Sequence, residues 1–230
     1  IEEQKVELNS NIDEARIRVN NMVVPTNKFA GSLFSPITLK ANAPANYKFV
    51  GWRSNNGGAI EEINLFSKGD TWKYYDQGPL SSKYWTRKGY SATSWGEGNA
   101  PLGYYTSDSN NGRGYNTFLD YGSDPNNKRP TYYFRKEFTI NNTPTENDVV
   151  SLDYTVDDGM IIYINGVEAS RYLMNSGDIT YDSFSSTYAN NNPDSGKITL
   201  PISLFKKGRN VIAIEVHNNN GNSSDIYFDA

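Results

Sequence analysis

The chain has 230 residues, enough for one large domain or two ordinary ones, and it carries 22 Lys and Arg against 26 Asp and Glu, a formal net charge of −4. This balance argues against binding to nucleic acid, because contact with a phosphate backbone requires clustered cations. The absence of cysteine excludes disulfides and thiol nucleophiles, and a single histidine, His217, leaves little scope for a zinc site or a Ser-His-Asp triad. The longest apolar run, Met160 to Ile164, is far shorter than the roughly 20 residues that span a bilayer.

Short alternating segments near the N-terminal end predict a small β-domain. Aromatic residues make up 13% of the chain, which favours a folded protein over a disordered one. Apolar and polar residues alternate, as in half-buried strands, over residues 5–8, 15–19, 37–40 and 47–52. Asn20-Asn21 and residues 43–46 supply turns. We therefore expect a first domain with its connector over residues 1–66 and a second domain over residues 67–230, and we interpret the chain, which opens at Ile1, as a fragment of a longer protein.

The second domain contains the clearest strand signals of the chain. They cover residues 131–140, 149–156, 160–164, 196–200 and 210–217. The dipeptide Asn165-Gly166 predicts a tight hairpin, since a type I′ turn needs two residues with positive φ. Residues 75–130 are rich in Gly, Tyr and Asn with weak strand signals, which indicates a long ordered excursion. Almost nothing favours helix, so the pattern predicts an all-β sandwich or barrel.

Motifs in the second half of the chain carry a family resemblance. Asp157-Asp158-Gly159 is followed by residues 161–168, Ile-Ile-Tyr-Ile-Asn-Gly-Val-Glu, and later by residues 204–216, which end in Asn-Val-Ile-Ala-Ile-Glu-Val. Together they resemble the galactose-binding-domain-like jelly roll. That fold includes the sugar-binding domains of family 2 glycosidases and many carbohydrate-binding modules.

Further motifs narrow the resemblance to one group of these modules. Residues 72–74, Trp95, 100–104 and 132–136 look like a subset of these modules that is appended to secreted bacterial proteins, including CotH-type proteins and hydrolases of gut Bacteroidetes. In the first domain, residues 29–31, 37–40 and 47–52 are similar to small cell-surface β-repeats found beside such modules. The resemblance implies a C-terminal galactose-binding-like β-sandwich jelly roll behind a small N-terminal β-domain, secreted or attached to the cell surface.

The resemblance also implies a function, that of a non-catalytic carbohydrate-binding module. We expect it to act as a monomer and to bind plant or host polysaccharide, with xylan-like or galactose-containing glycans as the best guess. The alternative is a structural or protein-interaction module that positions a neighbouring catalytic domain at the cell surface. A small hydrolase ranks last, because no Gly-x-Ser-x-Gly motif accompanies His217 and 26 acidic residues do not by themselves reveal a catalytic carboxylate pair.

The long Gly- and Asn-rich segment, residues 75–130, contains the aromatic residues of the candidate sugar site. A sugar ring gains most from stacking on one aromatic platform, and Trp85 is the only Trp of the second domain outside a motif interpreted as structural. The flanking aromatic residues and the hydrogen-bonding residues after the last long strand complete the predicted site: Tyr84, Tyr104, Tyr105, Tyr115, Asn218, Asn219 and Asp225. They converge if the loops 76–90 and 104–116 meet at one end of the sandwich. The alternative is that these aromatic residues hold their own loops together.

The polar faces of three predicted strands offer a second candidate surface. Alternation places five side chains on one face if these strands are neighbours: Tyr133, Arg135, Asp153, Glu215 and His217. Some carbohydrate-binding jelly rolls bind sugar on such a face. The alternative, which we favour, is a solvated face with cross-strand ion pairs.

Acidic residues raise the question of metal binding. Asp157 and Asp158 could bind Ca²⁺ or work as an acid–base pair, but a tight turn in which they accept backbone N–H bonds is the simpler interpretation. Related jelly rolls often hold a structural Ca²⁺ between the first strand and the last. Asp70 and Asp229 occupy those places in this sequence, so the resemblance implies a structural Ca²⁺ there.

Overall fold

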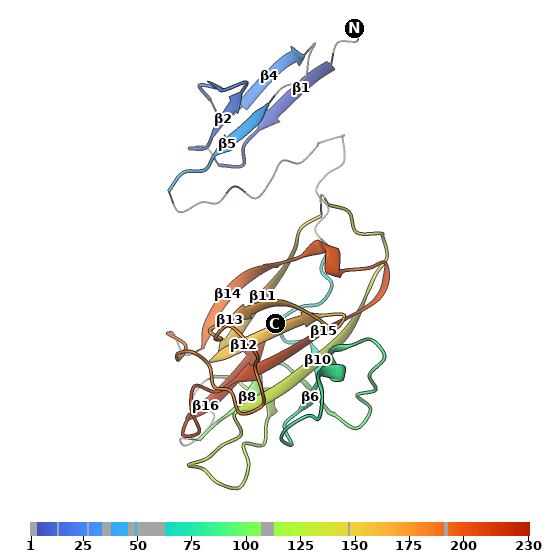
Figure 1. Ribbon diagram of the computed structural model, residues 1–230, viewed down its shortest axis with the longest axis vertical. Coiled ribbons are helices and arrows are strands. Elements are labelled where there is room, and N and C mark those ends of the chain that lie inside the picture. The colour runs from blue at the N-terminus through green and yellow to red at the C-terminus, as the bar shows by residue number, and fades with distance from the viewer. Residues whose placement is uncertain are drawn as a thin grey trace. The chain divides into compact units, whose positions relative to one another are not determined.

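The computed structural model describes residues 4–12, 14–26, 28–33, 38–45, 49, 63–106, 113–146, 148–190 and 193–230. They fall into two compact units, one within residues 1–60 and one within residues 61–230 (Figure 1). Strands dominate both units, and among the described residues no helix is long and apolar enough to cross a membrane. The all-β prediction is confirmed.

The first unit contains two small antiparallel sheets. Their strands are β1 (Gln4–Asn9) paired with β4 (Lys28–Leu33), and β2 (Arg16–Val19) between β3 (Met22–Val23) and β5 (Leu39–Asn42). Asn20 and Asn21 have φ angles of 50° and 68°, so the predicted turn joins β2 to β3. Ile17 and Val19 are buried, as alternation along β2 requires. The strand expected at residues 47–52 lies outside the described residues except for Phe49.

The second unit is a sandwich of two sheets. The six-stranded sheet has the order β13-β12-β15-β10-β6-β7, and the five-stranded sheet has the order β14-β11-β16-β8-β9. The strands are β6 (Thr71–Tyr75), β7 (Gly96–Asn99), β8 (Leu102–Tyr105), β9 (Thr117–Phe118), β10 (Thr131–Ile140), β11 (Val150–Asp157), β12 (Gly159–Ile164), β13 (Val167–Tyr172), β14 (Asp194–Leu200), β15 (Gly208–His217) and β16 (Asp225–Asp229). Two short 3₁₀ helices, η1 (Lys83–Thr86) and η2 (Ile202–Leu204), complete the unit.

The connectivity is that of a jelly roll, because the chain repeatedly crosses from one sheet to the other between β10 and β16. The five clearest strand predictions correspond to β10, β11, β12, β14 and β15. Asn165 and Gly166 adopt φ angles of 53° and 91° in the hairpin between β12 and β13, as the sequence predicts. Phe66, which was expected in the connector, packs edge-on against Trp72 at 5.6 Å between ring centroids.

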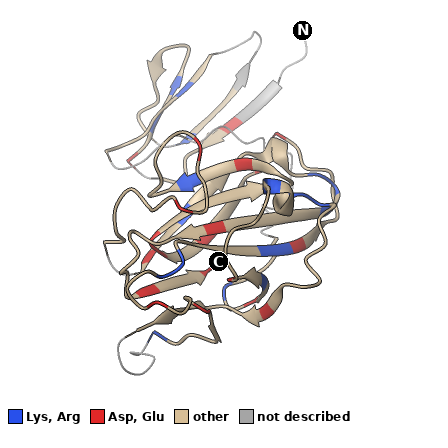
Figure 2. Ribbon diagram, turned by 60° about the horizontal axis from the view of Figure 1, so that its bottom comes forward, with Lys and Arg blue, Asp and Glu red and all other residues tan. Residues whose placement is uncertain are grey.

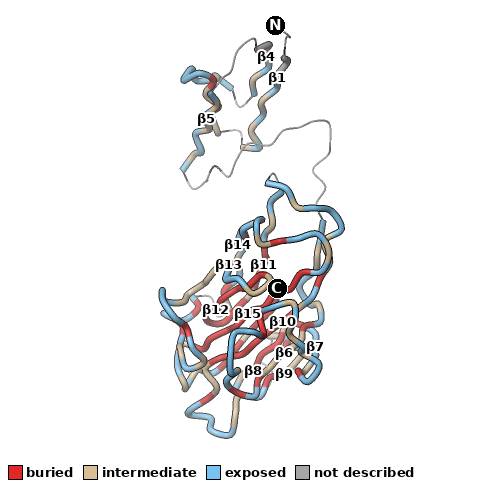
Figure 3. Tube along the Cα trace, turned by 45° about the vertical axis from the view of Figure 1, so that its right-hand side comes forward, coloured by how far each residue is buried: buried red, intermediate tan, exposed pale blue. Residues whose placement is uncertain are grey.

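The inner faces of the two sheets enclose the main core. Phe134 on β10 stacks on Phe228 on β16 at 4.1 Å between ring centroids, and Trp72 on β6 meets Phe228 edge-on at 5.0 Å. Ile162 and Ile214 are fully buried beside them. Figure 3 shows buried residues running along β10, β12 and β15. Alternation in the sequence predicts this apolar face correctly.

The outer face of the six-stranded sheet is covered as well. A second apolar cluster forms there from the outward side chains of β10, β12 and β15 and from two connecting segments: Trp85, Trp95, Tyr133, Ile161, Tyr163, Ile179, Val211 and Ala213. Trp85 and Trp95 come from the segment between β6 and β7, and Ile179 comes from the segment after β13. The sheet is therefore buried on both sides.

This second cluster overturns both interpretations of the polar sheet face. Register places Tyr133 opposite Glu215 on adjacent strands, so these side chains do share a face with Arg135 and His217. All four are buried under the covering segments, so these four side chains form neither the open sugar-binding surface nor the solvated surface that was expected. Asp153 does not join them, because β11 belongs to the five-stranded sheet, where Asp153 forms an exposed ion pair with Lys197 at 3.3 Å.

Candidate functional site: an aromatic cleft at one end of the sandwich

The predicted platform Trp85 is part of the second cluster. Its side chain is only 2% exposed, and its ring lies 5.0 Å from the ring of Tyr133 and 5.9 Å from those of Trp95 and Tyr163. The expectation that Trp85 forms an open aromatic platform is wrong. Helix η1 instead turns the indole onto the sheet, where burial of a large aromatic surface stabilises the fold.

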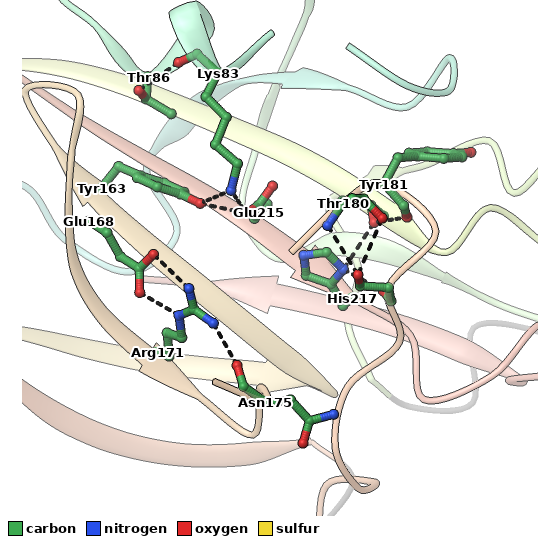
Figure 4. Close-up of polar contacts among 12 residues, drawn as sticks. Lys83, Thr86, Tyr163, Glu168, Arg171, Asn175, Thr180, Tyr181, Glu215 and His217 are labelled. Carbon is green, nitrogen blue, oxygen red and sulfur yellow. Dashed lines mark hydrogen bonds and ion pairs between the residues drawn. The ribbon is translucent and has the colours of Figure 1, made fainter. Parts of the chain in front are cut away.

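A hydrogen-bonded network fastens η1 to the sheet (Figure 4). Lys83 Nζ donates to the Tyr163 hydroxyl at 2.5 Å and lies 3.1 Å from Glu215 Oε1. The Tyr163 hydroxyl donates to the same carboxylate oxygen at 2.6 Å. Burial, and then the charge of Glu215, raise the pKa of Tyr163, so its hydroxyl keeps its proton and remains a donor. The two donors stabilise a buried carboxylate that would otherwise be costly.

Two of the flanking tyrosines are structural. Tyr104 and Tyr115 are buried, and the Tyr115 hydroxyl donates to the Tyr104 carbonyl at 3.1 Å. Burial raises the pKa of both hydroxyls. Tyr105 is half-buried beneath the Arg113 guanidinium, 4.8 Å from the ring centroid. Arg113 also pairs with Asp225, which is buried and therefore unavailable to a ligand.

The remaining predicted site residues are scattered. Tyr84 is exposed on η1, where its ring contacts that of Tyr90 at 6.1 Å. Asn218 is fully buried and donates to the Tyr104 hydroxyl and to the Arg129 carbonyl, both at 2.9 Å. Asn219 is half-buried after β15. The structure thus brings Asn218 to Tyr104, but it does not gather the predicted set into one open site.

The structure supports the simpler interpretation of the Asp157-Asp158 pair only in part, because Asp158 accepts backbone N–H bonds, from distant loops and not from a tight turn, and Asp157 forms an ion pair instead. Asp158 accepts the Ala189 N–H at 2.9 Å and the Asn219 N–H at 2.8 Å, which ties two loops together. Asp157 is buried with Arg113 at 3.6 Å. Burial, reinforced by Asp158, raises the pKa of Asp157 to about 8.

The carboxylates expected to bind calcium are already engaged. Gly69 N–H donates to Asp229 at 2.9 Å, so the start of the first strand does meet the end of the last. Asp70 accepts the Ser67 N–H at 3.1 Å and lies 3.3 Å from the Lys136 ammonium. Calcium requires six to eight oxygen ligands, and a neighbouring ammonium opposes a second cation. No group of three or more Asp, Glu, His or Cys side chains that could hold a metal ion occurs among the described residues.

An open cleft lies at the end of the sandwich where β10 begins and β15 ends. It has a volume of about 510 Å³. Its lining combines aromatic rings, carboxylates, an amide and two cations: Tyr121, Gly122, Ser123, Asp124, Asn127, Lys128, Arg129, Pro130, Tyr181, Asp182 and Phe184. Phe184 is 39% exposed, and Asp124, Asn127 and Asp182 are exposed beside it. We refer to these lining residues as the end cleft.

The wall formed by residues 121–130 is held by its own polar side chains. Asp120 accepts the Gly122 N–H at 2.8 Å and the Arg129 guanidinium at 2.9 Å. Asp76, from the segment after β6, accepts the Asp120 N–H at 2.8 Å. Lys128 Nζ lies 5.9 Å from the Tyr121 ring centroid, which places a cation against that ring. This wall is fixed before any ligand arrives.

The opposite wall is anchored to the sheet by His217 and Thr131, which face each other across β15 and β10. His217 Nδ1 donates to the Ser183 carbonyl at 2.7 Å, and the Thr131 hydroxyl donates to the Tyr181 carbonyl at 2.5 Å. Burial lowers the pKa of His217, so the imidazole is neutral at pH 7. Figure 4 shows His217 beside Thr180 and Tyr181. The histidine therefore positions the segment that carries Phe184.

The end cleft has the chemistry that a sugar requires. Aromatic faces can stack on the apolar C–H faces of a pyranose, while carboxylate and amide groups bind its hydroxyls. These residues escape prediction from the sequence because none of them is a tryptophan, the residue expected as the stacking platform. Loops cluster at the ends of β-sandwiches, and residues 121–130 directly precede β10. Their position at one end of the sandwich could therefore have been predicted from the sequence.

Comparison with known proteins gives a likeness of architecture. No family model and no curated protein matches the chain. A Bacteroides uniformis β-glucuronidase 2 structure matches 72% of this chain and 17% of its own, with 14% identity and a TM-score of 0.41. A Bacteroides vulgatus β-glycosidase matches 71% and 19%, with 19% identity and a TM-score of 0.40, and a family 2 glycosyl hydrolase of Bacteroides cellulosilyticus matches 71% and 20%, with 13% identity and a TM-score of 0.42.

The chain thus spans a fifth or less of the length of these structures. The second unit is a β-sandwich. The activities in the names of those enzymes are properties of those enzymes.

Proposed function

We propose that the second unit is a non-catalytic carbohydrate-binding module of a secreted or cell-surface bacterial protein and that the end cleft is its binding site. One observation carries this proposal: exposed Phe184 lies in the same cleft as Asp124, Asn127 and Asp182. This places an aromatic face beside carboxylate and amide hydrogen-bonding groups. Neutral or galactose-containing plant or host glycans, xylan-like chains among them, are the ligands that such a lining accommodates.

Affinity gel electrophoresis against a panel of neutral polysaccharides tests the proposal. We expect at least one polysaccharide to retard the protein and Phe184→Ala to weaken that retention about tenfold, because partial burial of a phenyl ring is worth on the order of 1.5 kcal/mol. Tyr188→Ala is the matched control, since Tyr188 is an aromatic residue of the same segment, 64% exposed and outside the cleft lining. Uniform lack of retardation, or equal losses in the two variants, would overturn the proposal.

A second candidate function is a structural module that positions a neighbouring catalytic domain. The observation in its favour is that Trp72, Trp85 and Trp95, three of the four tryptophans, are buried. Trp52 lies outside the described residues. Retention of the protein by none of the polysaccharides, together with altered activity of the longer protein when the chain is deleted, would favour this second function.

A further inference from the structure

A groove on the outer side of the six-stranded sheet gathers cations within an acidic unit. Residues 61–230 contain 15 Lys and Arg against 21 Asp and Glu, a net charge of −6. The groove has a volume of about 660 Å³ and lies between the segment 88–93 and residues of β6, β7, β10 and β15. Its charged lining residues are Lys73, Lys88, Arg135, Lys136, Arg209, Glu97 and Glu137. We call this surface the basic groove.

The carboxylates of the basic groove do not neutralise its cations. Lys73 pairs with Glu97 at 2.6 Å. Glu137 forms ion pairs with two cations, Arg135 at 2.9 Å and Arg209 at 3.5 Å. Lys136 is compensated outside the groove by Asp70. Figure 2 shows the resulting mixture of blue and red positions along the strands of the unit.

Among the described residues, Lys88 is the one cation of the basic groove for which no carboxylate partner occurs. Lys88 Nζ donates to the Arg209 carbonyl at 3.2 Å, and Arg209 Nη2 donates to the Lys88 carbonyl at 3.0 Å. Each cationic side chain thus reaches the main chain of the other residue, which ties together two segments that are 121 residues apart. Because Arg209 shares the Glu137 carboxylate with Arg135, positive charge is in excess along this part of the groove, and a bound anion would balance it.

The wall that carries Lys88 is formed in advance. Buried Arg135 donates to the main-chain carbonyls of Trp85 at 3.2 Å and Arg87 at 2.9 Å, which fixes the backbone leading to Lys88. Further along this wall, the hydroxyls of Ser91 and Thr93 are exposed and lie 3.2 Å apart. The basic groove therefore contains two cations, Lys88 and Arg209, and two neutral hydroxyl groups in the same lining.

We propose that the basic groove binds a carboxylate-bearing polysaccharide, a polyuronate, with its acid group on Lys88 and Arg209 and its hydroxyls on Ser91 and Thr93. A polyuronate supplies both kinds of group in one repeating unit. A nucleic acid fits less well, because single strands need open aromatic platforms on which their bases can stack. In this groove Tyr90 is half-buried, with its ring packed against Trp95 at 5.7 Å.

Isothermal titration with polygalacturonate tests this proposal. We expect Lys88→Gln/Arg209→Gln to weaken binding about tenfold at low salt, and Lys88→Gln alone to weaken it about threefold. Lys197→Gln is the matched control, because Lys197 is an exposed, ion-paired lysine on the five-stranded sheet and its replacement should leave affinity within about twofold. If the double variant fails to fold, Lys88→Gln decides, since half-buried Lys88 makes a single main-chain bond.

Three outcomes would overturn the proposal. One is equal binding of fully methyl-esterified polygalacturonate, which has the same sugar chain without its charge. Another is equal loss of affinity in Lys197→Gln, and the third is tighter binding of single-stranded DNA of the same length that the groove substitutions also weaken. Phe184→Ala should leave polygalacturonate binding unchanged, because the end cleft and the basic groove share no lining residue. This separates failure here from failure of the proposed function.

Discussion

The two faces of the six-stranded sheet are covered in different ways. The inner face packs against the five-stranded sheet, and the outer face packs under connecting segments that contain η1 and Ile179. On the inner face, apolar residues such as Phe134 and Ile214 alternate as expected. On the outer face, Glu215 and His217 suggested exposure, yet both are buried with hydrogen-bond partners. Polar residues in a strand therefore do not mark a solvated face when connecting segments bring donors and acceptors to them.

The largest effect expected from this comparison is that of Trp85→Ala. If the outer cluster is a true second core, the substitution costs about 3–5 kcal/mol of unfolding free energy, as much as Phe134→Ala on the inner face. Thermal or urea unfolding of the two variants measures this. A Trp85→Ala protein that unfolds like the wild type would mean that the outer face contributes little, and the comparison between faces would fail.

Removal of one hydroxyl from the outer network should have a smaller effect. Tyr163→Phe leaves Glu215 buried with Lys83 as its remaining side-chain donor, which costs about 1–3 kcal/mol of unfolding free energy. Tyr154→Phe, on the inner face of the five-stranded sheet, provides the comparison for loss of a tyrosine hydroxyl. If the urea midpoint falls equally in both variants, the hydrogen bond from Tyr163 to Glu215 contributes no more to the free energy of unfolding than the Tyr154 hydroxyl does.

The pH dependence of His217 sharpens the comparison further. Burial lowers the pKa of His217 in the folded state, so as the pH falls the unfolded chain takes up a proton first. The contribution of His217 to stability is therefore lost as the pH falls below about 6.5, the ordinary pKa of a histidine. His217→Gln should destabilise the protein at pH 7, and the difference from wild type should narrow at pH 5. A difference that is constant or grows on acidification would contradict a buried neutral imidazole.

Much of the fold follows from the sequence, and much of the site does not. Period-two alternation and the Asn165-Gly166 turn identify five long strands and their apolar faces, because these signals are local. The covering of Tyr133 and Arg135 depends on residues about 50 positions away, and no local pattern reports that contact. Trp85 was assigned to a surface for the same reason. Loop residues such as Phe184 become a candidate site only when two strand ends bring their segments together.

Calcium should have the smallest effect of all. The carboxylates of Asp70 and Asp229 accept backbone N–H bonds, and Lys136 supplies positive charge to Asp70. Added calcium at about 1 mM should therefore move the thermal transition by less than about 1 °C, since only a ligand that binds the folded state raises stability. A rise of several degrees that Asp229→Asn abolishes would restore the calcium site that the family resemblance implies.

The most direct measurement compares Trp85→Phe with Phe184→Ala in affinity gels that contain the polysaccharide that best retards the wild type. We place binding at the end cleft and assign Trp85 a structural role. Trp85→Phe keeps an aromatic ring in the outer cluster, so it should be retained like the wild type, while Phe184→Ala should lose retention with an unchanged thermal transition. Lost retention in a stably folded Trp85→Phe, with Phe184→Ala retained normally, would contradict the account.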